Sequence, residues 1–183
     1  MAPVSSSPDD GAAIAQVRTR LLDAAARLSE AGARTEALAE YVPARRVLLI
    51  PRPERMLRVG TVWRLGVVLL AVGAGDEPVL YATGSITRAH EPGRTTYIAA
   101  SAERRRQLRV AAYRGRFGPE ETVNFDAPPI AVDESLVGAS GPLTVHAGTA
   151  YVRWSATDRN ALVAFDDYLA ERVDLLVSPP EGA

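Results

Sequence analysis

Apolar residues recur at three- and four-residue steps along the first part of the chain, a spacing typical of the buried face of an amphipathic helix. This pattern comprises Ile14, Val17, Leu21, Leu22, Ala25 and Leu28. Asp9 or Asp10 can cap the start of such a helix. Gly32 weakens the pattern, but "RTEALAEYV" can continue it until Pro43 ends it. The pattern predicts a helix over about residues 11–41.

A similar apolar stripe marks a helix over Asn160–Val177, and prolines at 179 and 180 stop it. The stripe comprises Leu162, Phe165, Leu169, Val173 and Leu176. A third helix is predicted from Ala102 to about Arg114, with Ser101 as its N-cap.

Short apolar runs separated by glycines and prolines lie between these helices and predict an antiparallel meander. They are Arg45–Ile50, Thr61–Val72, Val79–Ala89 and Thr95–Ala100. Gly84 is expected to form a bulge or sharp bend in the third run. A further strand is predicted over Glu121–Asp126, and a hairpin pairs Leu143–Ala147 with Ala150–Trp154.

Together these elements predict an α+β fold, because hairpin-length connections dominate over strand–helix–strand crossovers. We expect a single domain over residues 11–178, with a disordered tail at 1–10 and a short tail at 179–183. The sheet is expected to be mainly antiparallel and curved, or a small barrel-like meander. Helices near residues 11–41, 102–114 and 160–177 flank it.

Composition narrows the possible chemistry. The chain has no cysteine, which excludes disulfides, thiol nucleophiles and thiolate metal sites. It has no lysine either, so Schiff bases, P-loop lysines and Ser-x-x-Lys nucleophiles are excluded. The first residues lack the pattern of a secretory signal. The longest apolar run, Gly66–Gly75, is too short to cross a bilayer. We therefore expect a cytoplasmic protein without a membrane partner.

The net charge of −1 hides an uneven distribution. Residues 45–116 hold fourteen arginines and five acids, a net charge of +9, whereas residues 117–183 carry a net charge of −8. Either the basic middle meets an external anion, or the two segments complement each other within one fold.

The segment from Ala102 to Gly118 concentrates six of the arginines. Extending the helix to residue 116 places Arg105, Arg106, Arg109 and Arg116 in one sector of its surface. Guanidinium groups bind phosphates and carboxylates through paired hydrogen bonds. The sector is thus a candidate site for a small anionic ligand or an acidic protein. Nucleic acid is not expected, because the isoelectric point is about 6.1.

Two other groups of basic or aromatic residues are weaker candidates. Arg58 and Arg64 could line a basic cleft if their strand abuts the arginine-rich helix. Trp63, on the same strand, could line a flavin site if the sheet closes into a small barrel. We nevertheless expect no cofactor.

Catalytic residues remain unknown from the sequence. His90 and His146 are too few and too far apart for a metal site, so none is expected. Either could act as a general base. Ser85 follows Gly84 but lacks the strand-to-helix elbow of hydrolase nucleophiles.

Several runs resemble a family of small actinobacterial proteins that often carry the label glutaminase: "RRVLLIPRPERMLRVGTVWRLGVVLL", "LYATGSITRA", "GPLTVHAGTAYVRWS" and "LAERVDLLVSPP". The resemblance implies activity on glutamine or a similar small amide. Serine glutaminases use Ser-x-x-Lys and amidotransferases use a Cys-His pair, neither of which this chain can supply. An amidohydrolase of a different mechanism is therefore the alternative to a binding protein.

Overall fold

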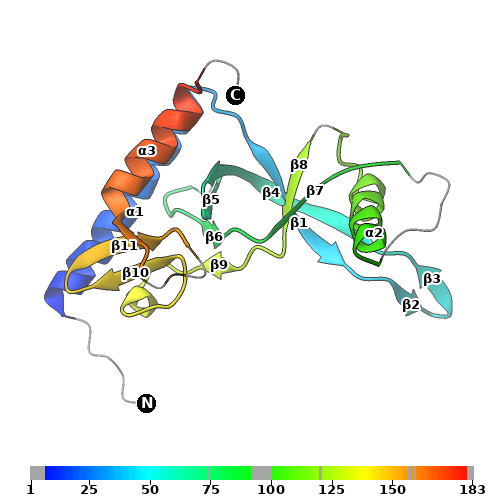
Figure 1. Cartoon of the computed structure of the whole chain (residues 1–183), viewed down its shortest axis with the longest axis horizontal. Helices are drawn as coiled ribbons and strands as arrows, with labels where there is room; N and C mark the ends of the chain where they lie inside the picture. The colour runs from blue at the N-terminus through cyan, green and yellow to red at the C-terminus, as the bar shows by residue number, and fades with distance from the viewer. Residues whose placement is uncertain are drawn as a thin grey trace, which may run out of the picture. The chain divides into compact units, whose positions relative to one another are not determined.

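The computed structural model of the 183-residue chain describes residues 7–73, 75–91, 100–119, 121–155, 158 and 160–180. Residues 1–6 of the expected disordered tail and nearly all of the expected strand at 95–100 lie outside this description. The described chain forms two compact units (Figure 1). Unit 1 comprises residues 1–35, 63–83 and 128–183, and unit 2 comprises residues 36–62 and 84–127.

Unit 1 contains two of the long helices and a set of short strands. Its elements are α1 (Pro8–Glu30), the end of β4 (Arg55–Leu65), β5 (Val68–Ala71), β6 (Leu80–Ala82), β9 (Pro129–Ile130), the 3₁₀ helix η1 (Glu134–Leu136), β10 (Leu143–His146), β11 (Thr149–Arg153), β12 (Leu162–Ala164) and α3 (Phe165–Val177). Strands β4, β5, β6 and β9 are neighbours in that order, and β10, β11 and β12 form a separate antiparallel sheet. The core of unit 1 collects the apolar faces of α1 and α3, including Val17, Leu21 and Leu28.

Helix α1 begins at Pro8, earlier than the sequence predicts, because Ser7 caps it. The Asp10 backbone N–H donates to the Ser7 hydroxyl at 3.2 Å, and the Ser7 N–H donates to the Asp10 carboxylate at 3.0 Å. This is a capping box. Asp10 also accepts a 2.8 Å hydrogen bond from the Gly148 N–H of the β10–β11 turn. That bond, followed by those from Ser7, lowers the pKa of the Asp10 carboxyl.

The continuation of the first helix to residue 41 is wrong. Gly32 adopts φ +59°, a left-handed conformation that ends α1. The N–H groups of Gly32 and Ala33 donate to the carbonyls of Ser29 and Leu28, at 3.1 and 2.9 Å, which is a Schellman motif. The next residues form strand β1 (Glu36–Val42), since pairing with two other strands outweighs their helical propensity.

Unit 2 is a sheet with one helix and a small hairpin. Its elements are β1, β2 (Arg45–Val47), β3 (Ile50–Arg52), the first part of β4, β7 (Ser85–Arg88), α2 (Ala100–Arg114) and β8 (Thr122–Phe125). The strand order is β7-β8-β1-β4, with β7 at the edge, and only the β1–β8 pair among these is parallel. A second core lies between this sheet and α2 and includes Met56, Ala111, Phe117 and Phe125.

Several strand predictions differ from the structure because the chain turns within an apolar run. Arg45–Ile50 is not one strand but the first half of the β2–β3 hairpin, which turns at Leu48 and Leu49. The run Thr61–Val72 divides at Gly66, which has φ +67°. The last helix begins at Phe165 rather than Asn160, because residues 162–164 pair with β11 instead.

The predicted fold class is confirmed: the protein is α+β, with mainly antiparallel pairing and three α-helices among the described residues. The sheets are open, so the barrel-like alternative is not what the chain forms. Strand β8, the β10–β11 hairpin and the helix ending at Arg114 also appear where the sequence predicts them.

Candidate functional site

The arginine-rich helix α2 packs one narrow face into the core of unit 2. Val110, Ala111 and Ala112 are buried, and Leu108 is half-buried. Gly115 and Phe117 follow the helix end, and Phe117 returns to the same core. The small size of the alanines lets the helix lie close to the sheet, and the long side chains of α2 lie outside this buried face.

Three arginines of α2 are held by partners within unit 2. Arg106 forms a salt bridge with Glu103 at 3.0 Å, one turn earlier on the helix. The pair raises the pKa of Arg106, and the hydrogen bond from Arg106 lowers the pKa of Glu103. Arg114 binds Glu54 at 2.7 Å. Arg104 lies 5.1 Å from the ring centre of Tyr41 and donates to its hydroxyl.

Arg105 and Arg109 are different. They are four residues apart, so they lie on the same face of α2. Both are exposed, and neither has an ion pair or side-chain hydrogen bond within the described part of the chain. Like charges at this spacing repel each other on a helix. The pair is therefore a position where a bound anion would relieve an unfavourable interaction.

A cleft of about 530 Å³ lies beside these two arginines, between α2 and the edge strand β7. Arg88, at the end of β7, adds a third guanidinium, and His90 adds an imidazole. The lining is completed by apolar and hydroxyl groups and includes no carboxylate among the described residues. It consists of Ile86, Thr87, Arg88, Ala89, His90, Arg105, Leu108, Arg109, Pro119 and Thr122.

The backbone connects the two walls of this cleft. The His90 N–H donates to the Arg109 carbonyl at 3.2 Å, which ties the end of β7 to the middle of α2. Arg88 pairs in register with Thr122 of β8, so its backbone is held by the sheet. The cationic groups are thus presented by a helix and a strand rather than by loops, which favours a defined geometry.

The structure brings together some of the predicted site residues and separates others. Arg105 and Arg109 line the cleft, whereas Arg106 lines neither this cleft nor any other described cavity and is engaged by Glu103. Arg116 is not on the helix: α2 ends at Arg114, and Arg116 has φ +63° in the turn that follows. Arg88 was not among the residues predicted from the sequence, because only the tertiary contacts place β7 beside α2.

Pairing with the acidic last third, one of the two alternatives that the charge distribution left open, is not what holds the arginines of α2 among the described residues. The ion pairs found for its arginines are to Glu103 and Glu54, which belong to the basic middle segment. Arg58 of β4 does bind an acid from the last third, Glu121, with both carboxylate oxygens at 2.7 Å. Arg58 also stacks on Phe117, so its guanidinium is already engaged by two partners.

The remaining candidates do not assemble into a second site. His146 lies in unit 1, whereas His90 and Ser85 lie in unit 2, and only His90 of these lines the cleft. Trp63 is only 3% exposed and donates to the Ala33 carbonyl from within the core of unit 1, so it lines no flavin pocket. No cluster of metal-binding side chains occurs among the described residues. In the same part of the chain, no helix is long and apolar enough to cross a membrane.

We compared the chain with models of known protein families, with curated proteins and with solved structures, and found no match in any of the three comparisons.

Proposed function

We propose that this chain is a binding protein for a small anionic ligand, which occupies the cleft between α2 and β7. One observation carries the proposal. Arg105 and Arg109 line the cleft without an ion pair among the described residues, while Arg104, Arg106 and Arg114 of the same helix are engaged. Their repulsion and their shared face make an anion the natural occupant.

The size of the cleft favours a small molecule over an acidic protein. Its volume of about 530 Å³ lies within the range of about 300–1,000 Å³ that is typical of small-molecule sites. Apolar side chains form part of the lining, with Ile86 and Leu108 on opposite walls. We therefore infer a ligand with one phosphate or carboxylate group, for the guanidinium groups, and an apolar group beside it.

The test is a titration of the whole chain with three simple probes: inorganic phosphate, phenyl phosphate and benzyl alcohol. Amide and arginine side-chain NMR shifts report on binding. Phenyl phosphate is expected to bind more tightly than inorganic phosphate and to shift signals of Arg105, Arg109 and His90. Benzyl alcohol, which lacks the charge, is expected to cause no comparable shift.

Charge reversal then locates the site. Losing one hydrogen-bonded charged contact costs about 1.5 kcal/mol or more, so Arg105→Glu/Arg109→Glu should weaken phenyl phosphate binding by more than about tenfold. Arg34→Glu is the matched control, because Arg34 is an exposed arginine in unit 1. Equal affinity of both variants for phenyl phosphate would refute the assignment, as would binding of benzyl alcohol at the same residues.

Hydrolysis of glutamine or another small amide stays the alternative function. His90 could act as a base in the cleft, where Thr87 and Thr122 also supply hydroxyl groups. Ammonia release from glutamine that is abolished by His90→Ala would favour this alternative. Absence of release at high protein concentration would count against it.

A further inference from the structure

The tip of the β2–β3 hairpin exposes large apolar side chains. Leu48 and Leu49 are each 91% exposed and Ile50 is 57% exposed. The three are consecutive, and they occupy the turn and the first residue of β3. Leu48 and Leu49 are the two most exposed large apolar side chains among the described residues. Ile50 is about as exposed as Ile86, Val59 and Trp154.

The backbone at this tip is also unusual. Leu48 and Leu49 have φ values of +48° and +67°, the left-handed conformation that a two-residue type I′ turn requires. Asparagine and glycine are the residues that favour such a turn, and bulky side chains are outliers there. The two leucines therefore do not make the hairpin more stable, which points to a role in contact with something outside the described chain.

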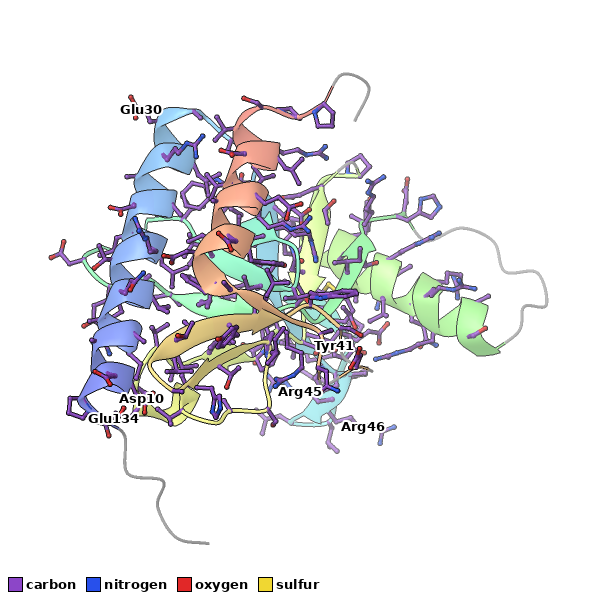
Figure 2. The ribbon with its side chains drawn as sticks, turned by 60° about the vertical axis from the view of Figure 1, so that its left-hand side comes forward. Asp10, Glu30, Tyr41, Arg45, Arg46 and Glu134 are labelled. Atoms are coloured by element: carbon purple, nitrogen blue, oxygen red, sulfur yellow. The ribbon has the colours of Figure 1, made fainter. Side chains whose placement is uncertain are left out.

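The arms of the hairpin are basic. Arg45 lies directly opposite Arg52 in the β2–β3 ladder, and like charges in this position repel each other. Both arginines line a cavity of about 470 Å³ at the base of the hairpin, together with Arg55 and Arg114. Arg114 is bound by Glu54, whereas Arg45, Arg52 and Arg55 have no ion pair among the described residues. Figure 2 shows Arg46 on the same hairpin as Arg45.

The distance between the apolar tip and the basic arms of the hairpin matches the depth of a membrane surface. Leu48 lies three positions after Arg45, which is about 10 Å along the extended arm. An interfacial segment buries its apolar part roughly 5–10 Å into the boundary between headgroups and acyl chains. Leucines among the acyl chains would thus place the arginines at the level of the lipid phosphates.

We propose that the β2–β3 hairpin docks this protein on an anionic lipid surface, with Leu48, Leu49 and Ile50 inserted and Arg45 and Arg52 bound to headgroup phosphates. A lipid surface accepts a convex apolar tip directly, whereas a protein partner would need a matching groove. The basic arms select anionic lipids, since each arginine near such a surface adds to the attraction. This proposal replaces the expectation from the sequence that the protein has no membrane partner. Attachment is to the surface only, since no described helix is long and apolar enough to cross a bilayer.

The experiment is sedimentation of the full chain with lipid vesicles. Vesicles of pure phosphatidylcholine are compared with vesicles that contain ~30% phosphatidylglycerol, which carry a negative surface potential. The protein is expected to sediment with the anionic vesicles and much less with the neutral ones. Raising the salt to about 1 M should weaken this binding, because screening shortens the reach of the charges.

Two double variants test the two halves of the proposal. Leu48→Asn/Leu49→Gly removes the apolar tip but introduces the sequence that type I′ turns prefer, so the hairpin is retained. Its partition onto anionic vesicles should fall by more than about tenfold. Arg45→Gln/Arg52→Gln removes the repulsion and two charges, with an expected loss of about 30-fold.

Matched controls are Leu175→Gln and Arg34→Gln, an exposed leucine and an exposed arginine of unit 1. Both should bind anionic vesicles like the unaltered chain. Failure of the unaltered chain to bind anionic vesicles would overturn the proposal, and so would equal binding to neutral vesicles or undiminished binding by either double variant. Capture of a protein through the hairpin without vesicle binding would replace the lipid by a protein partner.

Discussion

The hydroxyl of Tyr168 links helix α3 to the turn between β4 and β5, and its removal gives a quantitative test of how unit 1 is held together. The hydroxyl accepts a 2.9 Å hydrogen bond from the Val67 N–H and donates a 3.0 Å bond to the Leu65 carbonyl. Tyr168 is 4% exposed. A cation–π contact with Arg172, at 5.2 Å, uses the ring alone. Tyr168→Phe therefore removes two hydrogen bonds and keeps the packing.

The expected cost follows from those two bonds. Each contributes about 0.5–1.5 kcal/mol to the free energy of unfolding, so Tyr168→Phe should lose about 1–3 kcal/mol. Gly66 lies at the turn with φ +67°, and a Cβ there would stand 2.1 Å from the Tyr168 Oη. Gly66→Ala should cost about 1–2 kcal/mol for the left-handed backbone. It should also lose both hydroxyl bonds, since the new methyl displaces the hydroxyl.

The double variant Gly66→Ala/Tyr168→Phe separates these effects. Once the tyrosine is replaced, no hydroxyl remains to be displaced, and the next contact of the new Cβ is the ring carbon Cζ at 3.2 Å. The double variant should therefore be about as stable as Gly66→Ala alone, with a coupling free energy of about 1–3 kcal/mol. Urea unfolding measured by tryptophan fluorescence reports on unit 1, because both tryptophans lie in it and Trp63 is buried in its core. Additivity of the two single effects within ~0.5 kcal/mol would refute the reasoning.

Three further variants test other parts of the structure. Asp10→Asn should flatten the dependence of stability on pH. Because the pKa of Asp10 is lowered in the folded protein, its carboxylate stabilises the fold above its usual pKa, and this stabilisation is lost as the pH falls below about 4 through the folded pKa. Urea titrations at several pH values check this, and an unchanged acid sensitivity would contradict it. Gly115→Ala places a Cβ 2.2 Å from the Met56 carbonyl oxygen and should cost about 1–3 kcal/mol in a thermal melt; an unchanged melting temperature would contradict the close packing of α2. Leu48→Asn/Leu49→Gly should leave the melting temperature unchanged or raise it, because the leucines occupy strained positions; a lower value would mean that they stabilise the fold.

Local sequence patterns were sufficient to predict those elements that are formed mainly by residues close together in the chain. The buried face of α1, the C-terminal end of α2 and the β10–β11 hairpin all follow from short-range periodicity or turn residues, although α2 begins at Ala100, before its predicted cap Ser101. The α+β class follows from the same short connections. The end of α1 at Gly32 was not predicted, because the helical pattern continues past this glycine and only the structure shows its left-handed conformation.

Other elements depended on partners far away in the chain. Residues 36–42 have helical propensity but form β1, because β4 and β8 lie on either side of them. Backbone hydrogen bonds in a sheet are satisfied between segments, so no local window contains the deciding information. The same holds for residues 162–164, which pair with β11.

The candidate sites likewise combine features that the sequence alone determines with features that depend on the fold. The sequence by itself determined that the chain's basic groups are all arginines apart from its two histidines, that six of the arginines gather at residues 104–116, and that thiol and lysine chemistry are absent. Only the tertiary structure decided which arginines are available, because Glu54, Glu103 and Tyr41 reach three of them and leave Arg105 and Arg109 beside the cleft. It also placed part of an apolar run at an exposed hairpin tip. Both outcomes depend on which side chains meet across the fold, and that is a property of packing rather than of local composition.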